Sequence, residues 1–287
     1  MELGICSYSF RRLLAAGKQD IFQYITDCQA FGATQLDPWD EHLAPLKESE
    51  RTVWRVAANP RGVRLSRQDE AYLERVKDAA AEVGLSFGCI AVDGAHIYEP
   101  TLEARRANRA AAYGWLQVAA KLGAGQVRID AGGPEEMPIR VFRIIVEGYR
   151  DLVAWGQERG VEIVMENHWG PSRVPENAVK ILEAVDGLGL LFDTNNWAPG
   201  MQEKGWRMCA RYARGTHIKT FSFDTEGYEP SVNIPKAMRI LVDAGYGGYW
   251  GIESCPRNGD EYAGVRKTIA LIRQVLNGFS NGEGHCA

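Results

Sequence analysis

Four residues that can bind a metal ion stand at the ends of strand-like stretches of this 287-residue sequence. They are Glu166, Asp193, His217 and Glu253. The intervals between them are 27, 24 and 36 residues, and each interval is about the length of one strand followed by one helix. We therefore predict that the four side chains recur at the same level of four adjacent strands and converge.

This set of residue types favours a divalent metal ion. Three carboxylates that converge in a site of low dielectric repel one another, and their pKa values rise unless a cation neutralises them. Oxygen ligands with a single imidazole and no thiolate favour Mn²⁺ or Mg²⁺, with Co²⁺, Fe²⁺ or Zn²⁺ as alternatives. We expect one divalent ion bound by Glu166, Asp193, His217 and Glu253.

Strand alternation adds two further candidates, because residues two apart point to the same side of a strand. His168 follows Glu166 by two positions, and Lys219 follows His217 by two positions. A histidine there could carry a proton near neutral pH. The lysine could bind an enolate oxygen, a phosphate or a carboxylate of the substrate.

Aromatic and polar residues follow several of the same strands and could contact a sugar. Aromatic rings can stack on the C–H faces of a polyol, although core packing would explain each ring equally well. The candidates for substrate contact are Tyr8, Trp39, Trp169, Trp197, His96 and Arg257. Arg128 and Asp130 could join them or form an ion pair between strands.

Strand-like and amphipathic stretches alternate along the chain. The expected strands cover residues 3–10, 33–39, 85–92, 126–131, 161–167, 188–194, 216–221 and 249–254. The expected helices cover residues 19–31, 68–83, 101–122, 138–159, 175–186, 202–213, 234–244 and 259–277. Strict alternation of eight strands and eight helices predicts the α/β class and a single (β/α)8 TIM barrel, whose active site lies at the carboxyl ends of the strands.

The length by itself would allow two domains, but the strand count favours one catalytic barrel over residues 1–276. A flexible tail is expected over 277–287, and an irregular or part-helical excursion over 40–67. A doubly wound open sheet is the alternative architecture. It would normally carry a glycine-rich phosphate turn, and no GxGxxG or Walker A pattern occurs in the sequence.

Composition and charge narrow the function classes. Apolar residues make up 45% of the chain and charged residues 24%, as in ordinary globular proteins. The formal net charge of −4 and the lack of a basic run argue against nucleic acid as a partner. No leader-like segment and no apolar run of about 18 residues is present, so we expect a cytoplasmic protein without membrane contact. The six scattered cysteines are expected to be reduced and mostly buried.

With these residues in place, the chain resembles the xylose-isomerase-like TIM barrels, a family of sugar phosphate isomerases and epimerases that includes ketose 3-epimerases and hydroxypyruvate isomerases. The resemblance rests on Met165-Glu166-Asn167-His168, Phe192-Asp193-Thr194-Asn195, His217-Ile218-Lys219 and Gly251-Ile252-Glu253. It implies one divalent metal on the four ligands and Glu166 with Glu253 as the acid and base. Family epimerases commonly place a substrate-binding histidine three positions after the aspartate; this chain has Asn196 there, and we expect Asn196 to contact the substrate as well. The family also implies, weakly, a homo-oligomer or a partner subunit.

The expected reaction is isomerisation or epimerisation of a sugar or keto sugar, by proton abstraction beside a metal-bound carbonyl with an enediolate intermediate. The Glu166-Asn167-His168-Trp169 stretch is also similar to that of C-glycoside-deglycosidase-type lyases. In that alternative His168 removes a proton from a 3-keto-glycoside and the aglycone leaves by β-elimination. A non-catalytic sugar-binding barrel is a further alternative. Abasic-site endonucleases share the four ligands, but they need more histidines than the five in this sequence.

Overall fold

The computed structural model describes residues 2–280 and contains a nine-stranded sheet in which all pairs are parallel. The strands are β1 (Leu3–Cys6), β2 (Gln35–Asp37), β3 (Ser86–Phe87), β4 (Cys89–Val92), β5 (Gln126–Ile129), β6 (Glu162–Glu166), β7 (Gly189–Asp193), β8 (Ala213–Thr220) and β9 (Trp250–Ser254). Their order is β3-β2-β1-β9-β8-β7-β6-β5-β4. Only Gly88 separates β3 from β4, so the two ends of this order are halves of one strand that closes the barrel. The predicted (β/α)8 barrel is therefore confirmed.

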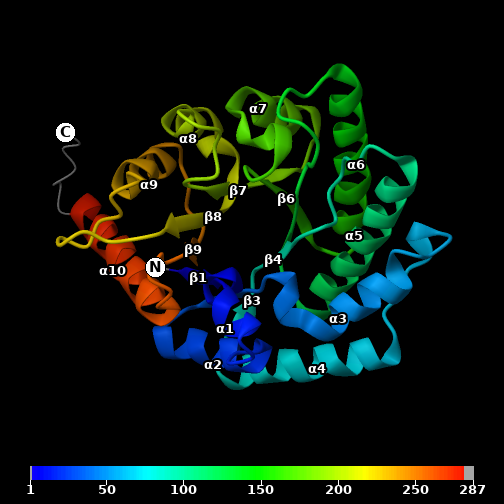
Figure 1. Cartoon of the computed structure of the whole chain (residues 1–287), viewed down its shortest axis with the longest axis horizontal. Helices are drawn as coiled ribbons and strands as arrows, with labels where there is room; N and C mark the ends of the chain where they lie inside the picture. The colour runs from blue at the N-terminus through cyan, green and yellow to red at the C-terminus, as the bar shows by residue number, and fades with distance from the viewer. Residues whose placement is uncertain (1, 281–287) are drawn as a thin grey trace.

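Helices form an outer ring around the strands (Figure 1). They are α1 (Arg11–Ala15), α2 (Ile21–Phe31), α3 (Ala44–Ser49), α4 (Arg67–Glu82), α5 (Leu102–Leu122), α6 (Ile139–Gln157), α7 (Pro175–Ala184), α8 (Gln202–Cys209), α9 (Ile234–Asp243) and α10 (Glu261–Ser280). The ends of α4 and α5 follow local sequence signals. Ser66 and Asp69 form a capping box at the start of α4, and Gly123 ends α5 in the left-handed conformation at φ 76°.

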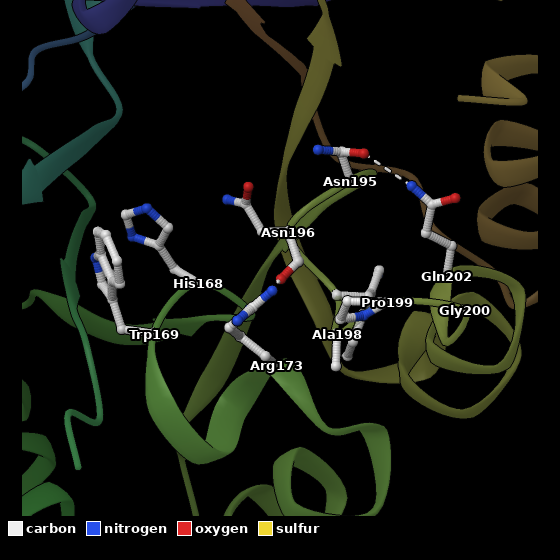
Figure 2. A pocket seen from close by; sticks show the side chains of 10 residues that line it. His168, Trp169, Arg173, Asn195, Asn196, Ala198, Pro199, Gly200 and Gln202 are labelled. Atoms are coloured by element: carbon white, nitrogen blue, oxygen red, sulfur yellow. Dashed lines mark hydrogen bonds between the residues drawn. The ribbon is translucent and has the colours of Figure 1, made fainter. Parts of the chain in front are cut away.

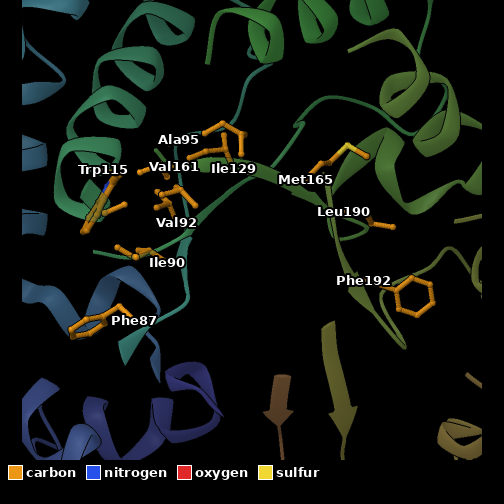
Figure 3. Packing of buried hydrophobic residues seen from close by; sticks show 14 of the residues in the cluster. Phe87, Ile90, Val92, Ala95, Trp115, Ile129, Val161, Met165, Leu190 and Phe192 are labelled. Atoms are coloured by element: carbon orange, nitrogen blue, oxygen red, sulfur yellow. The ribbon is translucent and has the colours of Figure 1, made fainter. Parts of the chain in front are cut away.

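Alternation along the strands separates two apolar regions. One large buried cluster fills the space between strands and helices, as Figure 3 shows for Ile90 and Val92 beside Trp115 of α5. A small second cluster, Cys89, Val164 and Leu191, belongs to the opposite face of the same strands. Inside the barrel, the side chains of the strands form this small apolar cluster. Polar side chains follow it at the carboxyl ends of the strands, where a TIM barrel has its active site.

The excursion after β2 is mainly helical. It contains the 3-10 turn η2 (Asp40–Leu43), α3, the π-helical turn η3 (Glu50–Trp54) and the 3-10 turn η4 (Pro60–Gly62). Buried side chains anchor it. The ring of Trp54 packs edge-on against Trp115, and Glu50 accepts a hydrogen bond from the Trp115 indole at 2.9 Å. This segment therefore belongs to the barrel wall.

Several expected boundaries differ from the structure, among them the start of β8 at Ala213, the end of α8 at Cys209 and both ends of the chain. The first strand ends at Cys6, because Ser7–Phe10 forms a 3-10 turn η1 in which the Ser7 and Ser9 hydroxyls bind distant backbone and side-chain groups. At the other end, α10 continues to Ser280, so the first part of the expected tail is helical and residues 281–287 lie outside the described residues. None of the helices among residues 2–280 is long and apolar enough to cross a membrane.

Candidate metal centre

Glu166, Asp193, His217 and Glu253 lie together at the carboxyl ends of β6, β7, β8 and β9. Each offers one ligand atom to a group in which all these atoms lie within 4.8 Å of one another. All four side chains are buried. We refer to these four residues as the acidic cluster.

The strands present the acidic cluster at staggered positions and not at one level. Asp193 is level with His217, but Glu253 is level with Lys219, two residues further along β8. Glu166 is level with Leu191, two residues before Asp193. Staggered register and tilted strands are properties of closed barrels, and here they bring the four side chains into one group. The expectation of one common level is thus wrong, although the side chains converge.

His217 and Lys219 each contact two carboxylates of the acidic cluster. Nδ1 of His217 lies 3.2 Å from Oε1 of Glu166 and 2.9 Å from Oε2 of Glu253. Nζ of Lys219 lies 2.9 Å from Oε1 of Glu253 and 3.3 Å from Oδ2 of Asp193. The three buried carboxylates are therefore partly neutralised by the protein.

These contacts determine the direction of each pKa shift. Burial by itself would raise the pKa of Glu253, but Lys219 and His217 hold this pKa well below its usual range. Burial also opposes ionisation of Glu166, and His168 with His217 lowers its pKa. For Asp193 burial dominates and the pKa is raised, despite the nearby Lys219. We expected the pKa values of all three carboxyl groups to be raised if no cation neutralised them. Only the pKa of Asp193 is raised.

The donor set fits a divalent cation. Oδ2 of Asp193 and Oε2 of Glu166 are buried and accept no hydrogen bond within the described residues, although Lys219 and Arg128 lie 3.3 and 3.1 Å from them. Buried anionic oxygens without hydrogen bonds are costly, and a further cation would stabilise them. A divalent ion together with the Lys219 ammonium would balance the three carboxylate charges while His217 stays neutral. Carboxylates with one imidazole are suitable ligands for Mg²⁺, Mn²⁺ or Zn²⁺.

The backbone around Asp193 is held by the neighbouring strand and loop. Asn167 accepts a hydrogen bond from the Asp193 N–H and donates one to the Asp193 carbonyl, both at 2.9 Å. The N–H groups of Asn195 and Asn196 donate to Oδ1 of Asp193 at 2.6 and 2.9 Å. One carboxylate oxygen is therefore fixed by the loop, and the other faces Lys219.

A second group of titratable residues adjoins the acidic cluster. Asp93, Asp130 and His168 offer ligand atoms within 4.8 Å of one another. The Arg128 guanidinium already occupies this group, with Nη1 2.9 Å from Asp93 and 2.8 Å from Asp130. Nε of Arg128 also lies 3.1 Å from Oε2 of Glu166. Arg128 and His168 thus face only two carboxylates in this group, whereas three carboxylates share Lys219 in the acidic cluster, so a divalent ion is better accommodated by the acidic cluster.

His168 connects the two groups. Its Nδ1 lies 3.2 Å from Oδ2 of Asp130 and 3.7 Å from Oε2 of Glu166. Burial would lower the pKa of His168, but Glu166 and Asp130 raise it above its ordinary value. An imidazole oriented by one carboxylate beside another can donate or accept a proton.

The structure brings together most of the predicted substrate contacts. A small cavity of about 100 Å³ above the acidic cluster is lined by Tyr8, Trp39, Trp169 and Lys219, among others. Asn196 accepts a hydrogen bond from Lys219 at 3.0 Å and donates one to Glu166 at 3.2 Å. The amide thus bridges two groups of the site.

Three predicted residues lie away from this cavity. Trp197 is buried and lines the neighbouring hollow in the loop after β7. His96 is half-buried near Glu99, and Arg257 is exposed after β9. Neither His96 nor Arg257 lines either hollow, and their part in substrate binding stays a prediction.

Sequence reasoning missed Asp93 and Cys6, which also line the small cavity. Asp93 directly follows the apolar strand β4, so the strand-end rule that selected Asp193 would have found it too. The suggested ion pair of Arg128 with Asp130 is present at 2.8 Å, but both residues belong to one stretch of chain. The contacts between strands run from Arg128 to Asp93 after β4 and to Glu166 on β6.

Residues 46–275 match the model of a protein family described as the xylose isomerase-like TIM barrel. No curated protein matches the chain.

Several solved structures share the fold. D-psicose 3-epimerase from Clostridium cellulolyticum H10, solved with D-tagatose, is 16% identical, with a TM-score of 0.72 over 96% of this chain and 99% of that one. The IolI protein with a bound zinc atom is 12% identical, with a TM-score of 0.72 over 96% and 98%. 3-keto-D-glucoside 4-epimerase from E. coli is 15% identical, with a TM-score of 0.66 over 96% and 99%. At these identities the likeness shows the fold alone.

Proposed function

The chain belongs to the xylose isomerase-like TIM-barrel family, and from that premise we propose that it is a divalent-metal-dependent isomerase or epimerase of keto sugars. The acidic cluster is the observation that carries this proposal, because it combines three buried carboxylates and an imidazole at the carboxyl ends of four strands. Two structural neighbours are sugar epimerases and a third was solved with zinc, which supports the assignment.

Glu166, Asp193, His217 and Glu253 would hold the ion. When bound there, a divalent ion supplies Lewis acidity that makes the C–H beside a sugar carbonyl easier to deprotonate. Mn²⁺ and Mg²⁺ are the ions we favour, because three of the four ligands are carboxylates.

Glu253 is our choice for the base. Its contacts with Lys219 and His217 keep it in the carboxylate form, which is the form that can accept a proton. The proton leaves the carbon beside the carbonyl for a carboxylate oxygen of Glu253, and the C–H electron pair shifts toward the carbonyl oxygen. Lys219 then stabilises the negative charge that develops on that oxygen.

Glu166 completes the reaction from the other side. It extends from β6, and two strands separate β6 from β9, which carries Glu253. Returning a proton from Glu166 to the opposite face of the same carbon gives the epimer. Returning it to the former carbonyl carbon, while the proton of the adjacent hydroxyl moves to the former carbonyl oxygen, gives the isomer. His168 lies 3.7 Å from Glu166 and can resupply that proton. No redox cofactor is required, because the carbon skeleton undergoes no net oxidation.

One observation favours a second reaction. His168 is hydrogen-bonded to Asp130 at 3.2 Å, an orientation that suits a single base. In a 3-keto-glycoside such a base could remove the proton at C2 and expel the aglycone by β-elimination. This lyase reaction needs one proton abstraction and no second carboxylate.

The deciding experiment incubates the protein with Mn²⁺ in D₂O and a panel of keto sugars and keto-glycosides. Deuterium at the carbon beside the carbonyl, with the skeleton retained, supports isomerisation or epimerisation. Release of an aglycone supports the lyase. Metal binding without either reaction would instead indicate a sugar-binding barrel and would refute the enzymatic proposal. A cytoplasmic location and a homo-oligomeric state or partner subunit stay predictions.

A further inference from the structure

A larger hollow adjoins the cavity above the acidic cluster. It measures about 560 Å³, whereas the cavity above the cluster measures about 100 Å³. His168 and Trp169 line both, so the two spaces share a wall. We call the larger hollow the loop pocket, because the loop of residues 195–200 and the start of α8 form much of it. Its size is within the range of about 300–1,000 Å³ that holds an organic ligand.

Polar amides line one side of the loop pocket and aromatic side chains the other. Figure 2 shows Asn195 and Gln202 facing each other across a hydrogen bond, with His168 and Trp169 on the opposite side. Nε2 of Gln202 donates to Oδ1 of Asn195 at 2.8 Å. This bond leaves Nδ2 of Asn195 and Oε1 of Gln202 without a partner in the described chain. One free donor and one free acceptor can bind a pair of hydroxyl groups.

The indole groups add apolar surface to the loop pocket. Trp169 is 51% exposed, which is unusual for so large an apolar side chain and leaves a ring face open to a ligand. Trp197 is buried, and its Nε1 has no hydrogen-bond partner within residues 2–280. Aromatic surface with a few placed polar groups is typical of small-molecule sites.

The charged side chains of the loop pocket are already paired. Nη1 of Arg173 lies 2.5 Å from Glu135, and its Nε donates to the Asn196 carbonyl at 3.4 Å. His168 is paired with Asp130. Both cationic side chains of the lining are thus held by carboxylates, which weakens their attraction for a phosphate. The loop pocket therefore favours a neutral ligand.

We propose that the loop pocket binds a second, neutral sugar unit, so that the natural substrate is a glycoside or disaccharide whose keto sugar lies over the acidic cluster. The keto sugar would occupy the small cavity, and its glycosidic partner would bind Trp169, Asn195 and Gln202. This inference rests on the proposed function for the placement of the keto sugar. It adds the substrate class, and it excludes a phosphorylated monosaccharide.

Binding measurements test the proposal without requiring turnover. With Mn²⁺ present, calorimetry compares D-fructose, D-fructose 6-phosphate, and two disaccharides that keep a free ketose, lactulose and isomaltulose. We expect at least one disaccharide to bind at least tenfold more tightly than fructose, and the phosphate to bind no more tightly than fructose. Equal affinities for fructose and both disaccharides, tighter binding of the phosphate, or no binding by any of the four sugars would overturn the proposal.

Variants then locate the second unit. Gln202→Ala should reduce the preference for the disaccharide over fructose about fivefold, and Trp169→Ala should reduce it as well. Gln274→Ala is the control, since Gln274 is exposed and donates to Tyr228 on another part of the surface. A preference that survives both pocket variants would contradict the assignment.

Deuterium exchange on the same sugars separates the two proposals. If a disaccharide binds tightly but no deuterium enters any of these ketoses, the loop pocket binds the second sugar unit as proposed. The same result would count against the proposed reaction. Exchange into fructose without any disaccharide preference would support the reaction and refute the second sugar site.

Discussion

The ammonium group of Lys219 lies 2.9 Å from Oε1 of Glu253, and the two residues are level on the adjoining strands β8 and β9. The same ammonium lies 3.3 Å from Asp193. A fixed cation inside a metal site has a clear electrostatic function. Three carboxylates carry three negative charges, a divalent ion would neutralise two of them, and the ammonium neutralises the third. Lys219 is therefore part of the charge balance of the site as well as a contact for substrate oxygen.

Replacing Glu253 by glutamine should abolish turnover, because the amide cannot accept the substrate proton. We expect Glu253→Gln to lower kcat by about 10²- to 10⁴-fold, the usual contribution of a positioned base. Deuterium exchange with a ketose in D₂O measures it, and circular dichroism checks that the fold is retained. Glu203→Gln is the control, because it replaces a carboxylate of a surface ion pair and should keep full activity. Undiminished exchange in Glu253→Gln would exclude this residue as the base.

Lys219→Met should destabilise the metal-free protein, because two buried carboxylates lose their cation. Removing one member of a buried ion pair typically costs about 3–5 kcal/mol. Added Mn²⁺ should raise the Tm of this variant more than that of the parent protein, since the ion replaces missing positive charge. Lys204→Met is the matched control, because Lys204 pairs with Glu176 at the surface, where such pairs contribute about 0–1 kcal/mol. An equal Mn²⁺ response in both variants would contradict the charge-balance argument.

Removal of the metal should lower thermal stability, and Asp193 should be required for this effect. A ligand at 100 times its Kd stabilises the folded state by about 2.7 kcal/mol, which corresponds to several degrees in Tm. We expect the difference between Mn²⁺ and EDTA to vanish in Asp193→Ala. Asp186→Ala, at an exposed carboxylate before β7, should keep it. Calorimetry with and without EDTA measures both, and a persistent metal response in Asp193→Ala would place the ion elsewhere.

The free energy of unfolding should decrease as the pH falls, because His42 is buried in its neutral form. Burial lowers the pKa of His42 to about 4, and its two ring nitrogens contact Ser7 and Gln19. An unfolded histidine has a pKa of about 6.5, so between these values the unfolded chain binds more protons. The stabilisation is complete above pH 6.5 and is lost as the pH falls toward 4.

The His42→Gln variant isolates this contribution, since glutamine does not titrate. Between pH 7 and 4.5 the parent protein should lose about 2 kcal/mol more unfolding free energy than the variant. Urea unfolding at the two pH values measures the difference. Parallel losses in the two proteins would show that His42 keeps an ordinary pKa in the folded state.

Much of the site can be predicted from the sequence because it depends on local periodicity. Strand alternation places Glu166 on the same face as Val164 and Asp193 on the same face as Leu191, and both Val164 and Leu191 belong to the small inner cluster. The same alternation brings Lys219 to the side of His217. The sequence also indicates where β6 and β7 end, since their apolar stretches stop at Glu166 and Asp193, whereas β9 continues one residue past Glu253.

Contacts between strands could not be predicted in this way. Glu253 is level with Lys219 and not with His217, and this register arises from strand stagger around the closed barrel. The contact of Arg128 with Asp93 depends on β4 lying beside β5, and neither residue carries a local signal for it. The loop pocket likewise needs His168 and Trp169 to meet residues from the loop after β7.

The sequence by itself determined the barrel, the inward direction of the four ligands and the identity of their donor atoms, because these follow from alternation and residue type. Only the tertiary structure decided how the carboxylates are neutralised, which group Arg128 fills and where space remains for a substrate. Those features depend on distances between chain segments far apart in sequence, and closure of the barrel sets these distances.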